Sequence, residues 1–248
     1  MSTILGIDIE TYSSVPLPKC GVYRYTDAPD FEILLFSYAY DDGPVMTIDL
    51  ACGEQLPADV LAALEDPAVI KVAYNAQFER VCLSRYLGHW LDPHQWRCTM
   101  VMAAYLTLPG RLADAAVALG TTEKKMEEGK DLIRYFSVPC KPSKTNGGRT
   151  RNLPTDAPEK WAVYRQYNAQ DVETERAIRK ALEKYPVLRW NFDNAYVRTD
   201  PAGNLKLDKE KSTEKIDGAV ALVMALDRAM KNQNGCDSVY DDRGLLLL

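Results

Sequence analysis

Histidines, paired cysteines and long apolar runs are scarce or missing in this sequence of 248 residues. It has only two histidines, His89 and His94, and none of its six cysteines forms a Cys-x-x-Cys pair, so neither a zinc site nor a disulfide framework is indicated. No apolar run approaches the roughly 20 residues that cross a bilayer, and the first residues lack the pattern of a signal peptide. We therefore expect a cytoplasmic protein with no membrane contact.

The sequence also lacks an excess of positive charge. Its formal net charge of -5 argues against a protein that coats nucleic acid indiscriminately. The same charge is compatible with an acidic pocket that needs metal ions and with local basic loops. With 46% hydrophobic and 26% charged residues, the chain has the composition of a globular protein that buries a full core.

Alternating strands and helices are predicted along the chain. The expected strands are residues 4–12, 31–40, 45–50 and 68–75, of which the first three form an antiparallel meander after a loop at 13–30. The expected helices are residues 57–67, 75–90, 99–108, 111–120, 129–139 and 155–185. Asn75 is the expected cap of the second of these helices, and Asp156 that of the last, which has Pro158 in its first turn. The pattern predicts an α/β fold in which helices flank a mixed sheet.

Near Tyr185 the sequence pattern changes from that of a long amphipathic helix to that of short extended segments. This change predicts two domains, at residues 1–185 and 186–248. The second is expected to contain two short strands around a turn at residues 200–204, followed by a helix from about Thr213. Between residues 141 and 154 the sequence is basic and contains a glycine pair, which predicts a mobile loop.

The segment ILGIDIETY, residues 4–12, contains two acids inside a run that is typical of a buried strand. Side chains two residues apart on a strand point the same way, so Asp8 and Glu10 would lie side by side. Their mutual repulsion and their desolvation both cost free energy, so a compensating group is expected.

Two further segments supply acids. YNAQFE places Glu79 in the first turns of a helix, and YNAQD places Tyr167 and Asp171 four residues apart on one helix face. A cluster of carboxylates at a sheet edge is stable when divalent ions occupy it. Two Mg²⁺ or Mn²⁺ ions about 3.5–4 Å apart would clamp the attacking and leaving oxygens of a phosphodiester.

These three segments resemble, in chain order, the motifs of 3′–5′ exonuclease domains of the DEDD type. The resemblance is to the tyrosine subclass (DEDDy), found as the proofreading domain of family A DNA polymerases, and it covers about residues 3–185. It implies a ribonuclease-H-like fold. It also implies two-metal hydrolysis that releases nucleoside 5′-monophosphates from the 3′ end of single-stranded or frayed DNA.

The resemblance also implies a role for each motif residue. Asp8, Glu10 and Asp171 would bind the tighter metal, with Asp8 bridging to a second metal that Glu79 reaches directly or through water. The second motif usually ends in aspartate, so Glu79 is a departure from the family pattern. Tyr167 would orient the attacking water, because a tyrosine with an ordinary pKa near 10 is a poor base at neutral pH.

Contacts to the nucleic acid are expected from two further groups. Thr11, Asn75 and Phe78 would shape the cleft for the terminal nucleotide. The basic loop would hold phosphates in a sequence-independent, salt-sensitive way through Lys141, Lys144, Arg149 and Arg151.

The tail, residues 186–248, resembles the C-terminal end of the large terminase subunit of tailed phages. Asp217, in the segment KIDGAVAL, matches a late acidic ligand of that nuclease. The other carboxylates of a terminase site have no counterparts here, so the tail is expected to pack as a strand pair and helix without that activity. Both resemblances imply a phage or prophage origin and the cytoplasm of a bacterial host.

Two alternatives remain beside the exonuclease that acts on DNA 3′ ends. One is a 3′–5′ exoribonuclease of the same architecture, because a contact to the 2′-hydroxyl cannot be inferred from this sequence. The other is a catalytically weak interaction protein that acts with phage replication or packaging machinery. A phage polymerase or replication protein acting in trans is a further expected partner.

Overall fold

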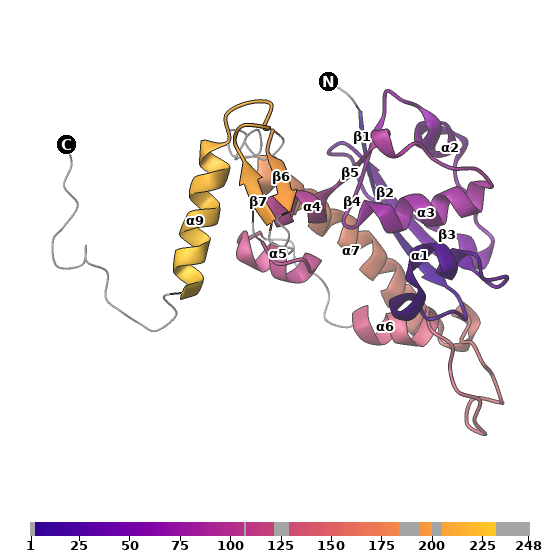
Figure 1. The fold of residues 1–248 in the computed structure, drawn as a ribbon. Coiled ribbons are helices and arrows are strands. Elements are labelled where there is room, and N and C mark those ends of the chain that lie inside the picture. Colours follow the sequence, from indigo (N-terminus) through magenta and orange to yellow (C-terminus); the bar gives the residue numbers. More distant parts are fainter. Residues whose placement is uncertain (1–2, 107, 122–128, 184–193, 200–204, 232–248) are drawn as a thin grey trace. The chain divides into compact units, whose positions relative to one another are not determined.

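The computed structural model describes residues 3–106, 108–121, 129–183, 194–199 and 205–231 (Figure 1). The chain divides into two compact units, Met1–Lys184 and Tyr185–Leu248. Every helix in the described ranges is too short or too polar to cross a membrane.

A five-stranded mixed sheet forms the centre of the first unit (Figure 1). Its strands are β1 (Ile4–Tyr12), β2 (Glu32–Tyr40), β3 (Met46–Asp49), β4 (Ile70–Ala73) and β5 (Trp96–Cys98). They lie in the order β3-β2-β1-β4-β5. Strand β2 is antiparallel to β1 and β3, whereas β4 is parallel to β1 and β5. This arrangement confirms the predicted α/β, ribonuclease-H-like mixed sheet and the antiparallel meander of the first three strands.

Helices cover both faces of this sheet. They are α1 (Leu17–Thr26), α2 (Ala58–Glu65), α3 (Ala76–Leu87), α4 (Thr99–Tyr105), α5 (Leu112–Ala118), α6 (Gly129–Phe136) and α7 (Pro158–Glu183). The unit also contains three short 3₁₀ helices in its described residues: η1 (Leu50–Cys52), η2 (Pro93–Gln95) and η3 (Pro154–Asp156).

The two faces of β1 have different partners. Leu5, Ile7 and Ile9 pack in the hydrophobic cluster that includes residues of α2 and α3. On the other face, a Cβ built at Gly6 would lie 3.8 Å from the Val172 side chain of α7. Because side chains alternate along a strand, Asp8 and Glu10 share the Gly6 face and are directed toward α7.

Two elements differ from the prediction. The segment 13–30, predicted as a loop, contains α1, which is interrupted at Gly21 with a φ of 73°. Glycine adopts this left-handed conformation without the steric penalty that other residues meet, and the same glycine weakens the helical signal in the sequence. Strand β5 was not predicted, because three residues are too few to show an alternating pattern.

The two predicted caps also differ from the prediction. Asn75 occupies the residue before α3, but its φ is 91° and its side chain makes no capping hydrogen bond. The Asp156 carboxylate accepts a hydrogen bond from the Leu153 backbone N–H at 2.8 Å, so it closes η3 rather than capping α7. In the loop predicted to be mobile, the Asn146 side chain donates to the Lys141 carbonyl at 2.9 Å.

The second unit contains the predicted strand pair and helix. Strand β6 (Tyr196–Thr199) pairs antiparallel with β7 (Leu205–Asp208), and α9 (Asp217–Lys231) follows. The helix begins at Asp217 rather than at Thr213, and the predicted turn at residues 200–204 lies outside the described residues. Asp217 is exposed and forms an ion pair with Lys209 at 2.5 Å.

Helix α7 carries a fully buried carboxyl group at Glu175, to which the Thr99 hydroxyl donates a hydrogen bond. Burial raises the pKa of Glu175, although the Thr99 hydrogen bond and the charge of Arg179 oppose the rise. The folded chain therefore binds more protons than the unfolded chain above the ordinary glutamate pKa of about 4.3. Folding stability that is present below that pH is lost as pH rises through the raised pKa.

We expect the Glu175→Gln change to flatten this decline. The free energy of unfolding, measured by urea titration in EDTA, should fall from pH 5 to pH 8 more steeply for the wild-type protein than for the variant. The exposed Glu159 on the same helix provides the control, Glu159→Gln, which should keep the wild-type slope. Equal slopes for wild type and Glu175→Gln would contradict this assignment.

Candidate functional site

The end of β1 places Asp8 and Glu10 on the face of the sheet that α7 covers. Glu10 is 8% exposed and Asp8 is half-buried. The pairing of β1 with β2 shifts register between Glu10 and Thr11, so a bulge follows directly after the second acid. Bulges bend a strand and re-aim its side chains, and they are frequent beside active sites.

Helix α7 contributes a row of polar side chains to the same place. Tyr164, Tyr167, Asn168 and Asp171 follow the three- and four-residue spacing of one helix face. The Tyr164 hydroxyl donates to Glu10 Oε2 at 2.5 Å, and Asn168 Nδ2 donates to Asp8 Oδ2 at 2.6 Å. Two side-chain hydrogen bonds therefore connect β1 to α7.

Tyr167 lies among three carboxylates. Burial raises its pKa above the ordinary value, and the negative charges of Asp171, Glu10 and Asp8 raise the pKa further. A hydrogen bond joins its side chain to Asp171. Tyr167 therefore keeps its proton at neutral pH and acts as a hydrogen-bond donor rather than as a base. The structure thus brings together four of the five residues that the motifs predicted.

Glu79, the fifth, lies in the first turn of α3 and is 4% exposed. Burial raises the pKa of its carboxyl group; a backbone hydrogen bond opposes this and the charge of Glu10 adds to it. Its buried Oε2 atom makes no hydrogen bond. The left-handed Asn75 turns the chain between β4 and α3 and so directs the helix that carries Glu79.

The chemistry of these donors fits a hard divalent cation, which prefers carboxylate oxygens. A cation would also satisfy Glu79 Oε2, which a proton would otherwise have to neutralise. Among the residues that the structure describes, however, no three His, Cys, Asp or Glu side chains are arranged as a metal-binding group. Tyr164 and Asn168 each donate a hydrogen bond to one oxygen of Glu10 and of Asp8, respectively.

A cavity of about 550 Å³ adjoins Glu10. Its walls come from the end of β1, the start of α1, α3 and the segment around the end of α6. Thr11 and Phe78 line it, and the Thr11 hydroxyl is hydrogen-bonded to the Tyr25 hydroxyl at 2.8 Å. Asn75 is exposed and is not one of the lining residues, so the structure gives no support to its predicted place in the cleft.

The predicted phosphate contacts divide into two pairs. The Arg151 guanidinium lies 4.0 Å from the centre of the Tyr12 ring and forms an ion pair with Glu32 at 2.5 Å. Arg149 forms an ion pair with Asp156. Both arginines are therefore partly neutralised within the fold. The other pair, Lys141 and Lys144, is exposed.

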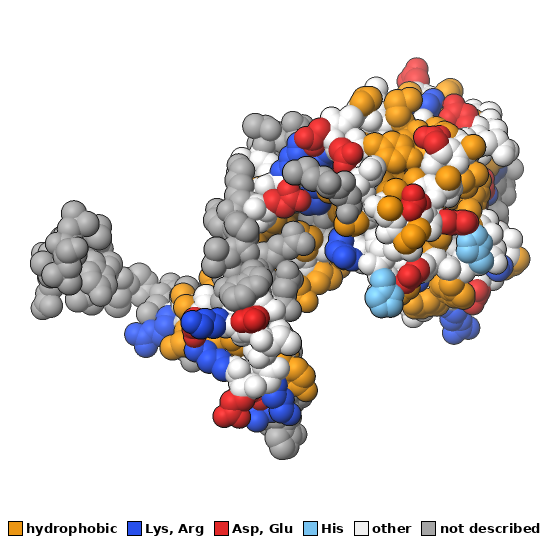
Figure 2. Space-filling model, turned by 90° about the horizontal axis from the view of Figure 1, so that it is seen from above, with side chains coloured by type: hydrophobic (Ala, Val, Ile, Leu, Met, Phe, Trp, Pro, Cys, Tyr) orange, Lys and Arg blue, Asp and Glu red, His pale blue; other side chains and the backbone are white. Residues whose placement is uncertain are grey.

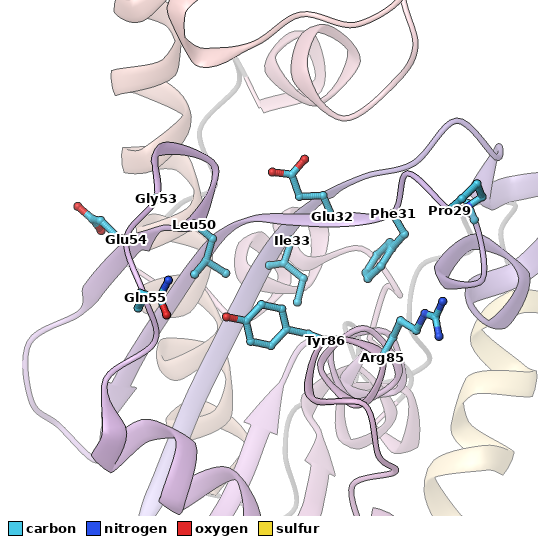
Figure 3. Close-up of a pocket in the computed structure, with 11 residues that line it drawn as sticks. Pro29, Phe31, Glu32, Ile33, Leu50, Gly53, Glu54, Gln55, Arg85 and Tyr86 are labelled. Atoms are coloured by element: carbon cyan, nitrogen blue, oxygen red, sulfur yellow. The ribbon is translucent and has the colours of Figure 1, made fainter.

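Two other surface features are separate from the acidic cluster. A cavity of about 350 Å³ lies between the start of β2, the turn after η1 and α3, and the Tyr86 ring extends from α3 toward Leu50 and Ile33 (Figure 3). It contains none of the predicted site residues. Both histidines lie at the surface (Figure 2), where His89 contacts Glu65 and His94 contacts Asp92.

Sequence reasoning missed three residues of the site: Tyr164, Asn168 and Ser37. Tyr164 and Asn168 share the helical spacing of Tyr167 and Asp171, so the face of α7 could have identified them. Ser37, whose hydroxyl donates to Asn168 Oδ1 at 2.5 Å, has no such signal, because a lone serine in an apolar strand is common.

Comparison with known proteins connects the chain to two phage proteins. It is 58% identical over 184 residues to the DNA polymerase of Bacillus phage SP02, which covers 74% of this chain and 28% of the polymerase. Such identity shows that the chain is homologous to a phage DNA polymerase. The chain is also 43% identical over 58 residues to the large terminase subunit of Enterobacteria phage HK97, covering 23% of this chain and 12% of that subunit.

The tail matches a family model and the whole chain has a structural neighbour. The terminase large subunit endonuclease domain matches residues 172–233, which begin within α7 directly after Asp171. Among solved structures, Brucella melitensis NrnC is similar with a TM-score of 0.44 and 13% identity, covering 95% of this chain and 89% of that chain. A structure of NrnC with bound Mg²⁺ is similar with a TM-score of 0.40 and 12% identity, over 95% and 90% of the two chains. The chain spans little more than a quarter of the phage polymerase and about an eighth of the terminase subunit.

Proposed function

We propose that the first unit is a metal-dependent 3′–5′ exonuclease of the DEDD type, tyrosine subclass. The observation that carries the proposal is the gathering of Asp8, Glu10 and Asp171 around the protonated Tyr167. Homology to a phage DNA polymerase supports DNA rather than RNA as the substrate. The reaction is hydrolysis of the last phosphodiester bond, which releases a nucleoside 5′-monophosphate.

Asp8, Glu10 and Asp171 would hold one divalent ion, and Asp8 with Glu79 a second. When bound, Mg²⁺ or Mn²⁺ acidifies the attacking water and stabilises the charge that develops on the phosphate.

The remaining residues would position the substrate. Tyr167 donates its one proton to Asp171, so its hydroxyl oxygen would orient the water by accepting a hydrogen bond from it. The cavity beside Glu10 accepts the terminal nucleoside, with Phe78 and Tyr25 supplying apolar ring surface. The exposed Lys141 and Lys144 hold phosphates further along the strand. A phage polymerase or replication protein remains a proposed partner in trans.

A time course on a 5′-labelled single-stranded DNA oligomer tests this function. With Mg²⁺ or Mn²⁺ we expect a ladder that shortens one nucleotide at a time from the 3′ end, and no shortening in EDTA. An RNA oligomer of the same sequence, run in parallel, decides between DNA and RNA as the substrate. No shortening of either oligomer in either metal would contradict the proposal and favour the interaction protein.

A further inference from the structure

We infer that Thr47, Ser37 and Asn168 form a relay of hydrogen bonds that positions the Asp8 carboxylate. The inference rests on the proposed function, because it assigns these three residues a part in metal binding by Asp8. Thr47 and Ser37 lie outside the three acidic motifs, and Asn168 lies within YNAQD but has no role assigned by the motif.

The sheet places Asp8, Ser37 and Thr47 in one row across three strands. Asp8 on β1 is directly opposite Ser37 on β2, which is directly opposite Thr47 on β3. Directly opposite residues point to the same face of a sheet, so all three face α7. Asn168 approaches this row from the helix and contacts Asp8 and Ser37 at once.

The contacts are short and two of the residues are fully buried. Ser37 Oγ lies 2.7 Å from Thr47 Oγ1 and 2.5 Å from Asn168 Oδ1. Asn168 Nδ2 lies 2.6 Å from Asp8 Oδ2. Ser37 and Asn168 are both 0% exposed. An unsatisfied polar group at such depth is costly, so each member depends on its neighbour.

The hydrogen bonds of the relay can run in only one direction, from Thr47 toward Asp8. A serine hydroxyl has a single proton, and Ser37 donates it to the Asn168 carbonyl oxygen. Thr47 must therefore be the donor in its contact with Ser37. With its oxygen held by Ser37, the Asn168 amide can present only its NH₂ group to Asp8. The relay thus fixes a donor, and never a second acceptor, against the carboxylate.

This arrangement restricts how Asp8 can turn. One oxygen, Oδ2, is held toward Asn168, which leaves the orientation of the carboxylate plane defined before any cation arrives. Hydrogen bonds behind a ligating carboxylate set its orientation, and their loss typically costs 10–100-fold in metal affinity or activity. Asn168 is in this sense a positioning residue, and Ser37 positions Asn168.

The test compares Asn168→Ala, Ser37→Ala and the double variant with the wild-type protein. Two quantities are measured: kcat and KM on a DNA oligomer, and the rise in melting temperature as Mn²⁺ is titrated without DNA. We expect Asn168→Ala to lower kcat about 10–100-fold with KM nearly unchanged, and to shift the Mn²⁺ titration to about tenfold higher concentration. The double variant should have the same kcat and the same Mn²⁺ titration as Asn168→Ala, because both changes break the same series of hydrogen bonds.

Thr174→Val is the matched control. Thr174 is a buried α7 residue whose hydroxyl donates to the Gln170 carbonyl at 2.8 Å, away from the relay. This change should alter melting temperature but neither kcat nor the Mn²⁺ titration. If Asn168→Ala does not fold, Thr47→Val and its conservative counterpart Thr47→Ser replace it. Only Thr47→Val should then weaken Mn²⁺ binding.

The two proposals fail in different ways. A wild-type protein that binds Mn²⁺ but degrades no oligomer overturns the exonuclease, and the Mn²⁺ titration of the variants still decides the relay. An active wild-type protein whose Asn168→Ala or Thr47→Val variant keeps the wild-type Mn²⁺ titration overturns the relay alone. Independent, additive losses from Ser37→Ala and Asn168→Ala would also overturn it.

Discussion

The Asp171→Asn variant is expected to lose at least about 1,000-fold in exonuclease rate while keeping its fold. Metal ions contribute several kcal/mol of transition-state stabilisation in such reactions, and each 1.36 kcal/mol is a factor of ten. Asparagine has the shape of aspartate and still accepts a hydrogen bond from Tyr167, so packing around α7 should survive. The rate on a 5′-labelled oligomer and the circular dichroism spectrum measure the two effects.

The control for this variant is Asp131→Asn. Asp131 is exposed on α6, so the same chemical change there should leave the rate within about twofold of wild type. Both variants are purified in parallel, which also excludes a contaminating nuclease as the source of activity. If Asp171→Asn retained more than about a tenth of the wild-type rate, Asp171 would not be the metal ligand that the several kcal/mol attributed to metal require.

The Gly129→Ala variant is expected to lose about 100-fold in rate although Gly129 carries no functional group. A Cβ at this position would lie 2.6 Å from Cζ of the Tyr167 ring and closer still to its Cε2. Tyr167 is 1% exposed and stacks on Tyr164 at a centroid distance of 6.0 Å, so the ring has little room to move. Displacing a catalytic group by about 1 Å can cost a factor of 100, and overpacking typically costs 1–3 kcal/mol of stability.

Gly110→Ala is the matched control for this change. A Cβ built at Gly110 has no atom within 4 Å, so the same substitution there meets open space. We expect wild-type activity and near wild-type stability from it. A Gly129→Ala protein with both unchanged kcat and unchanged melting temperature would show that Tyr167 is less tightly packed than the structure indicates.

The parts of the fold that could be predicted are those with a strong local pattern. Strand β2 is nine residues long and rich in branched and aromatic residues, and α7 is a long amphipathic helix, so both were found near their observed bounds. Helix α1 was not predicted because Gly21 and two prolines give this segment a composition that is typical of a loop. Strand β5 is formed by pairing with β4, which no local pattern of three residues can reveal.

The site shows the same division between local and long-range information. Spacing placed Asp8 beside Glu10 and Tyr167 beside Asp171, because a strand or a helix alone fixes those neighbours. The contacts that hold the acids join residues 131 to 160 positions apart: Ser37 with Asn168, Tyr164 with Glu10, and Asn168 with Asp8. The ion pair between Arg151 and Glu32 could likewise not be predicted, because these residues are 119 positions apart in the sequence.

The separation of β1 and α7 along the chain has a consequence for synthesis on the ribosome. Chains emerge at about 5–20 residues per second, so α7 leaves the ribosome on the order of ten seconds after Asp8 and Glu10. Until then, the acidic strand has neither Asp171 nor Tyr167 beside it. We therefore expect a nascent chain that stops before α7 to have no nuclease activity, and activity to begin only once the first unit is nearly complete.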